Sequence, residues 1–280
     1  MRTIQSAEIT TAIKGLFLNL STCAGTDLTD ALDQALVKEE SPAGRDVLEQ
    51  IIENYAIARE EQVAICQDTG MAIVFAQVGQ DLHIEGGFEA AVQEGVRQAY
   101  ADGYLRKSIV KDPLFDRSNT GDNTPAVIHV SLVPGDRLHL TAIAKGFGSE
   151  NMSALKMLVP ADGVSGLRRF VLETVEKAGP NPCPPLILGI GVGGTFEQAA
   201  LLAKRATALP VTHHNPHPQY RQLEDDLLRD VNALGVGPGG VGGRTTALKV
   251  HILQAPTHIA ALPVALNICC HAARHAETTL

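Results

Sequence analysis

The sequence is poor in aromatic residues, with no Trp, four Tyr and seven Phe among its 280 residues. The chain is nevertheless long enough to bury a large core, because 45% of its residues are hydrophobic and it has 280 residues in all. That core must rest on Leu, Val, Ile and Ala.

Several functional classes lack their usual signals here. No stretch approaches the roughly 20 uninterrupted apolar residues of a membrane span, and residues 1–5 lack the apolar region of a secretory signal. The net charge of −8 and the absence of a basic stripe argue against nucleic-acid binding. A few local cations can still hold an anionic substrate. Five irregularly spaced cysteines do not indicate a disulfide framework. We expect a cytoplasmic protein with reduced thiols.

Hydrophobic periodicity predicts a mainly helical N-terminal part, residues 1–105, followed by a mixed sheet packed with helices, residues 106–280. Residues 127–133 and 138–144 are β-rich, and the Pro-Gly-Asp turn between them predicts a hairpin. The remaining predicted helices are 164–178, 195–206 and 219–234, and the remaining predicted strands are 186–192, 247–253 and 258–268. The expected fold class is mixed α/β (α+β), one domain of residues 1–280 with room for two lobes.

Residues 64–70, Ala-Ile-Cys-Gln-Asp-Thr-Gly, are the most informative segment. They place a soft metal ligand, Cys66, beside a proton-transfer group on backbone that is free to bend. Cys183 is braced by prolines, and Cys270 follows an apolar run. Three such thiolates could hold an iron–sulfur cluster with one iron open to substrate. The alternative is that the cysteines are ordinary core residues. Separations of 117 and 87 residues match no zinc-finger or ferredoxin pattern, so spacing alone leaves both open.

Other motifs have simpler explanations. The histidines of residues 213–218 are more typical of a solvated turn than of a zinc site. Residues 189–194, Gly-Ile-Gly-Val-Gly-Gly, depart from the dinucleotide fingerprint and predict a turn of close backbone approach. Residues 145–151 suit a carboxylate-binding turn and a structural turn equally. Residues 119–125 favour a series of Asx turns, and Arg106, just upstream, offers positive charge for a dicarboxylate.

Six motifs occur in order and together resemble one family, the alpha-type catalytic part of the class I fumarases and L-tartrate dehydratases. The resemblance covers residues 51–274. The motifs are Cys-Gln-Asp-Thr-Gly (66–70), Leu-Arg-Lys-Ser (105–108), Asp-Asn-Thr-Pro (122–125), Lys-Gly-Phe-Gly-Ser-Glu-Asn (145–151), Asn-Pro-Cys-Pro-Pro (181–185) and Thr-His-Ile-Ala (257–260).

The resemblance implies an oxygen-sensitive iron–sulfur hydro-lyase. A [4Fe-4S] cluster with one open iron would be held by three cysteines, which fall here on Cys66, Cys183 and Cys270. Cys270 is preferred to its neighbour Cys269 for its distance from the Thr-His motif and its position before Ala-Ala-Arg (272–274). Asp68 would handle the hydroxyl proton with His258 as its partner. The substrate carboxylates would be held by Gln67, Arg106 and the amide of Gly148.

In this family the catalytic base and further arginine and lysine contacts lie on a separate beta-type domain, and none follows Leu280. We therefore expect an alpha subunit that is inactive without a beta-type partner and pairs with a second alpha chain, giving an α2β2 assembly. The expected reaction is the hydration of fumarate to (S)-malate, a step of the tricarboxylic acid cycle. The alternatives are L(+)-tartrate dehydration and, more distantly, a non-catalytic binding or scaffold role.

Overall fold

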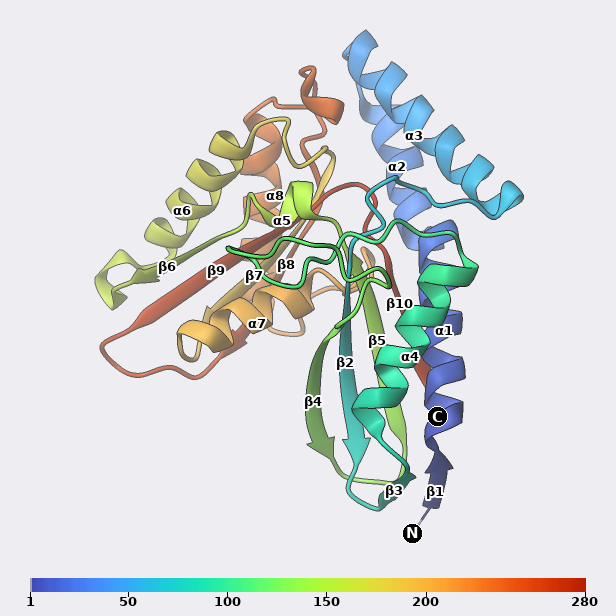
Figure 1. Cartoon of the computed structure of the whole chain (residues 1–280). Helices are drawn as coiled ribbons and strands as arrows, with labels where there is room; N and C mark the ends of the chain where they lie inside the picture. Colours follow the sequence, from blue (N-terminus) through green and yellow to red (C-terminus); the bar gives the residue numbers. More distant parts are fainter. Residues whose placement is uncertain (1) are drawn as a thin grey trace. The chain divides into compact units, whose positions relative to one another are not determined.

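The structure, a computed structural model, describes residues 2–280, which form two compact units. The first unit contains the chain up to Gly25, residues 55–147 and residues 274–280. The second contains residues 26–54 and 148–273. Each unit is therefore assembled from segments that lie far apart in sequence, as the colours of Figure 1 show.

A four-stranded mixed sheet in the order β10-β5-β2-β4 forms the centre of the first unit. Its strands are β2 (Met71–Gly79), β4 (Val127–Val133), β5 (Leu138–Lys145) and β10 (His275–Thr279). β2 pairs in parallel with β4 and antiparallel with β5. A small parallel pair, β1 (Arg2–Gln5) with β3 (Leu82–Glu85), lies beside it.

Two helices, α1 (Ser6–Thr22) and α4 (Phe88–Asp102), supply the apolar side chains that cover one face of this sheet (Figure 1). Their buried residues recur at three- and four-residue intervals, as on one side of a helix. The resulting core includes Ile13, Phe17, Val96 and Tyr100, which meet the buried alternate residues of β2 and β5. This packing fixes the start of β2, where the Cys66 motif lies.

The second unit repeats the same pattern of strand directions, in the order β6-β9-β7-β8. Its strands are β6 (Ala154–Leu158), β7 (Leu186–Gly193), β8 (Ala247–Ala255) and β9 (Leu262–Cys269). Its helices are α2 (Thr26–Lys38), the first part of α3 (Pro42–Glu61), α5 (Phe147–Glu150), which begins in the first unit, α6 (Gly163–Ala178), α7 (Phe196–Ala206) and α8 (Pro218–Ala233). Short 3-10 turns lie at Pro160–Asp162 and Pro238–Gly240.

The central strand β7 separates two kinds of packing. Its even-numbered residues, such as Leu188 and Ile190, join the apolar core formed with α6 and α8. On the other face, a Cβ at Gly189 or Gly191 would overlap with backbone atoms of α7. The glycines therefore allow α7 to lie directly on the strand. The prediction of close backbone approach is confirmed, although most of this glycine motif lies within the strand rather than in a turn.

A buried carboxylate joins the α2–α3 connection to the loop before β8. Glu39 is 3% exposed and accepts backbone N–H groups from Glu40, Ser41, Arg244 and Thr245 at 2.9–3.1 Å. Burial by itself raises the pKa of Glu39, but these four donors outweigh it and hold the pKa below the usual 4.5.

Most predicted elements are present, with three corrections. The hairpin between 127–133 and 138–144 is wrong, because the strongly apolar β2 lies between these strands and pairs with both. The strand predicted from residue 258 begins at Leu262, since residues 258–261 form a turn. The part before residue 105 also contains β1, β2 and β3, and a cut at 105 would separate β2 from its sheet partners.

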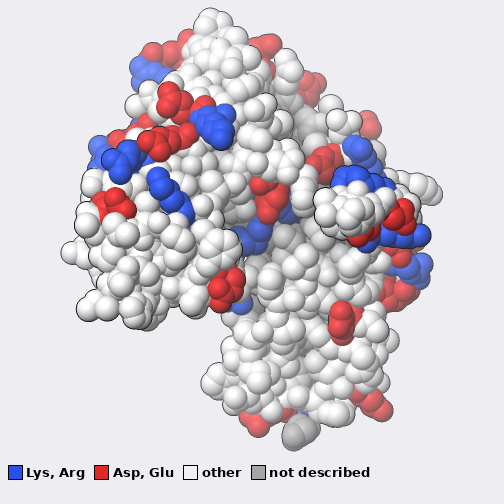
Figure 2. Space-filling model, turned by 60° about the vertical axis from the view of Figure 1, so that its left-hand side comes forward, with Lys and Arg blue, Asp and Glu red and all other residues white. Residues whose placement is uncertain are grey.

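Charge is distributed without a dominant sign on the face shown in Figure 2, where basic and acidic side chains intermingle. Of the helices in residues 2–280, none combines the length and apolarity required to cross a membrane.

Candidate active site

The Cys66 motif forms a loop between α3 and β2 that is held from three sides within the first unit. The Tyr100 hydroxyl donates to the carbonyl oxygens of Thr69 and Gly70 at 2.8 and 3.0 Å. The Asn123 amide donates to the Gly70 oxygen at 3.1 Å, and the Thr69 hydroxyl donates to the Arg106 carbonyl at 2.8 Å. The loop is therefore rigidly positioned by side chains distant in sequence.

Gly70 is required where it stands. Its φ is +79°, and a Cβ would lie 2.8–2.9 Å from backbone atoms of Ala144 and Lys145. The loop therefore passes directly against the end of β5.

Asp68 is oriented by two backbone amides. One carboxylate oxygen accepts the N–H of Gly70 at 3.0 Å, and the other accepts the N–H of Phe147 at 2.8 Å. The side chain is half-buried, so it remains accessible to a small molecule. These bonds join two predicted motifs, residues 66–70 and 145–151, and fix the direction in which the carboxylate points.

Two buried groups near Asp68 were not singled out as site residues by the sequence. Burial raises the pKa of Tyr100 well above its usual 10; the nearby Arg274 charge lowers it and the Asp68 charge raises it. Tyr100 is fully buried and Arg274 is 4% exposed. Asn123 was expected in a series of Asx turns and within the Asp-Asn-Thr-Pro motif, without a role of its own in the site. That series is confirmed at Asp122, whose carboxylate accepts the Thr124 N–H at 2.9 Å.

The predicted substrate contacts of the first unit, Gln67 and Arg106, are both exposed. The backbone of Arg106 is fixed by the Thr69 hydroxyl, and the neighbouring Ser108 N–H donates to the Asn123 side chain at 2.7 Å. Both residues therefore extend from the anchored loop system toward the outside of the unit.

The cysteines of the second unit differ in accessibility. Cys183 is exposed, has a φ of +55°, and its carbonyl accepts the His271 N–H at 3.3 Å. This bond brings Cys183 beside the segment that contains Cys270, which is half-buried. Cys269 is 5% exposed within β9, opposite Ile187. Cys66 belongs to the first unit and is half-buried.

The other predicted residues of the second unit lie in loops and short turns. His258 is exposed in the turn before β9, and its Nδ1 accepts the Ala260 N–H at 3.2 Å. Gly148 is exposed in α5. The residues that follow Gly148 are anchored, because Glu150 pairs with Lys204 and the Ser153 hydroxyl accepts the Ile268 N–H at 3.0 Å.

The histidine-rich loop 213–218 is organised by Asn215. Its buried amide donates to the Ile252 carbonyl at 2.8 Å, and its side-chain oxygen accepts the His217 N–H at 2.9 Å. The turn interpretation is thus the better one. Within residues 2–280, no group of three or more His, Cys, Asp or Glu side chains is arranged to hold a single metal ion.

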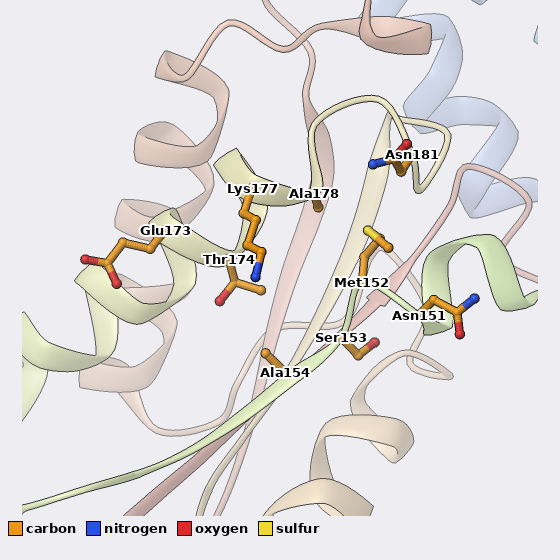
Figure 3. Close-up of a pocket in the computed structure, with 9 residues that line it drawn as sticks. All are labelled: Asn151, Met152, Ser153, Ala154, Glu173, Thr174, Lys177, Ala178 and Asn181. Atoms are coloured by element: carbon orange, nitrogen blue, oxygen red, sulfur yellow. The ribbon is translucent and has the colours of Figure 1, made fainter.

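A cavity of about 480 Å³ lies between α6 and the segment that leads into β6 (Figure 3). Nine residues line it: Asn151, Met152, Ser153, Ala154, Glu173, Thr174, Lys177, Ala178 and Asn181. It borders two motifs, those of residues 145–151 and 181–185, but none of the predicted ligands or catalytic residues lines it.

Comparison with known proteins decides the family. The model of the family described as fumarate hydratase (Fumerase) matches residues 10–279. The chain belongs to the fumarate hydratase family. A Methanocaldococcus jannaschii protein named "Putative L(+)-tartrate dehydratase subunit alpha" is 39% identical over 274 residues, covering 96% of each chain.

Bacterial relatives extend this similarity. The L(+)-tartrate dehydratase subunit alpha of Escherichia coli strain UTI89 is 30% identical over 97% of this chain and 92% of its own. The protein of the same name from strain K12 is 29% identical over the same shares. The family thus confirms the resemblance that the six motifs carry and identifies the chain as a member of a group of hydro-lyases.

Proposed function

We propose that this chain is the alpha subunit of an iron–sulfur hydro-lyase that interconverts fumarate and (S)-malate. The observation that carries the proposal is the family match over residues 10–279. The oriented carboxylate of Asp68 adds a suitable proton-transfer group.

The donor chemistry of the chain suits a [4Fe-4S] cluster. Cys66, Cys183 and Cys270 are outside disulfides and at least partly accessible, and two of them lie on adjoining segments of the second unit. In a cubane, each cysteine binds a different iron, so the thiols need not converge on one point as ligands of a single ion do. We assign these three as ligands. When bound, a cluster with one iron not held by cysteine supplies a Lewis acid for the departing hydroxyl.

The residues of the chain would divide the remaining work. Asp68 exchanges a proton with the substrate hydroxyl, because its carboxylate is accessible and held in one orientation by two amides. His258 is its proposed proton partner. Gln67, Arg106 and the Gly148 amide bind the carboxylates, and the guanidinium of Arg106 is suited to a two-point contact.

We further propose a beta-type partner that supplies the base. The relatives named above are themselves called subunit alpha. In the first unit, residues 109–120 form a hydrogen-bonded finger, with the Lys111 N–H donating to the Ser118 carbonyl at 2.9 Å. At its tip, Leu114 is 76% exposed and Phe115 is 93% exposed. Since the base of this finger adjoins the Asp68 loop, a partner that covers the tip would stand next to the site. Pairing of two alpha chains, giving α2β2, is part of this proposal.

L(+)-tartrate is the second candidate substrate, and the names of the relatives favour it. Anaerobic co-expression with a beta-type subunit, followed by assays with fumarate, (S)-malate and L(+)-tartrate, decides between them. We expect the highest kcat/KM with fumarate and malate. A higher value with tartrate would replace the fumarase assignment, and a complex that contains no iron and acts on none of the three would refute the hydro-lyase.

A further inference from the structure

Arg274 carries a buried charge that no carboxylate among residues 2–280 neutralises by an ion pair. Its side chain is 4% exposed, and its Nε and Nη1 atoms have no hydrogen-bond partner within those residues. Its backbone is fixed, because its carbonyl accepts the Ala144 N–H at 3.1 Å just before β10 begins. A buried cation whose N–H groups lack acceptors is costly, and a bound anion would offset that cost.

The guanidinium lies against the same glycine as the Asp68 carboxylate. A Cβ on the buried Gly146 would lie 3.3 Å from Asp68 Oδ2 and 3.4 Å from Arg274 Nη2. The carboxylate and the guanidinium therefore both pack closely against Gly146, one as an acceptor and the other as a donor. The Phe147 N–H donates to Asp68 Oδ2 at 2.8 Å and so fixes the position of this oxygen next to Gly146.

We propose that Arg274 is a further substrate-binding residue, whose guanidinium holds one carboxylate of the dicarboxylate beside Asp68. The inference rests on the proposed hydro-lyase function. A 2-hydroxy acid carries its hydroxyl on the carbon next to the carboxylate. A carboxylate bound by Arg274 would therefore bring that hydroxyl within reach of Asp68. The alpha chain then provides a second arginine, beside Arg106, for the substrate carboxylates.

The test compares Arg274→Gln with wild type in the anaerobic complex with the beta-type subunit. Loss of a charge-assisted hydrogen bond should raise the KM of the dicarboxylate and the inhibition constant of unreactive succinate by about 10- to 100-fold. We expect kcat to change less than about threefold, with iron and sulfide content unchanged. Arg97→Gln is the matched control, because Arg97 forms an exposed ion pair with Glu94 on α4.

Thermal unfolding supplies a second readout. Without dicarboxylate, Arg274→Gln should unfold at the wild-type temperature or above, because it removes a buried charge without a partner. Succinate should raise the unfolding temperature of wild type and leave that of the variant unchanged. Gly146→Ala, whose Cβ would press against both side chains, should raise the same two constants, and it tests the proposal even if Arg274→Gln does not fold.

Each contrary result has a distinct meaning. A fall in kcat with unchanged KM and unchanged succinate inhibition would make Arg274 a positioning residue for Asp68 and overturn the proposal. Loss of iron in Arg274→Gln would assign the arginine to the cluster and overturn it as well. Wild-type enzyme that turns over no dicarboxylate but binds succinate through Arg274 would refute the proposed function alone.

Discussion

Replacing Tyr100 with Phe removes the hydroxyl that ties the Cys66–Gly70 loop to α4. Tyr100 is fully buried, and its hydroxyl donates to the Thr69 and Gly70 carbonyls at 2.8 and 3.0 Å. The Gly70 oxygen keeps its bond from Asn123, whereas the Thr69 oxygen loses this donor. Leaving one buried acceptor unsatisfied costs about 1–3 kcal/mol, so the free energy of unfolding should fall by that amount.

The pH dependence of this loss provides a further check. Since burial raises the pKa of Tyr100 above 10, the folded state favours the neutral phenol. The stabilisation is fully present below pH 10, the usual pKa in the unfolded chain, and is lost as pH rises from there toward the folded pKa. The difference between wild type and Tyr100→Phe should therefore shrink above pH 10.

Denaturant unfolding of the full chain at pH 7 and at pH 10.5–11 measures both effects. Tyr104→Phe is the matched control: the same substitution at a side chain that is 94% exposed should change stability by less than about 0.5 kcal/mol. A Tyr100→Phe variant as stable as wild type at pH 7 would show that the hydroxyl does not hold the loop.

Three other substitutions test separate parts of the structure. Glu39→Gln should lower the free energy of unfolding by about 2–3 kcal/mol at pH 7, as measured by denaturant titration. The loss should become smaller as pH falls below 4.5 toward the depressed pKa of Glu39, and a pH-independent loss would contradict this. Gly191→Ala should cost more than about 3 kcal/mol, because the Cβ overlaps with α7, and a normal unfolding temperature would disprove that contact. Asp68→Asn should reduce kcat by about 100-fold or more with iron retained, and near-normal turnover would place the acid elsewhere.

Local patterns predicted most elements, but not how they pair. The boundaries of β4 agreed with the prediction, yet the turn at Pro134 does not join two paired strands. That turn instead contacts the β2–β3 connection, where the Gln80 N–H donates to the Val133 carbonyl at 2.9 Å. Pairing was decided by β2, whose apolar residues suit a central strand buried on both faces. The polar strand β10 was not predicted, because it has no apolar pattern and is held in the sheet by backbone hydrogen bonds to β5.

Residues of the candidate site could be proposed from sequence motifs, whereas the tertiary contacts that position them could not. Asp68 stood out beside Cys66 and a glycine. Tyr100 did not stand out, and the contact of Asn123 with the loop could not be predicted from its motif. Both side chains bind carbonyl oxygens of that loop, which any donor of the right size and position could do. Arg274 served only as a landmark for Cys270, since nothing local reveals that its charge is buried and unpaired.

The central claim is that Cys66, Cys183 and Cys270 hold a cluster required for hydro-lyase activity. The most direct measurement is iron and sulfide content, with fumarate hydration, in serine variants of the anaerobically prepared complex. Each of these three variants should lose the cluster and the activity, whereas Cys269→Ser, at the buried neighbour in β9, should keep both. Full iron content and activity in all three ligand variants, or loss in Cys269→Ser with retention in Cys270→Ser, would contradict the assignment.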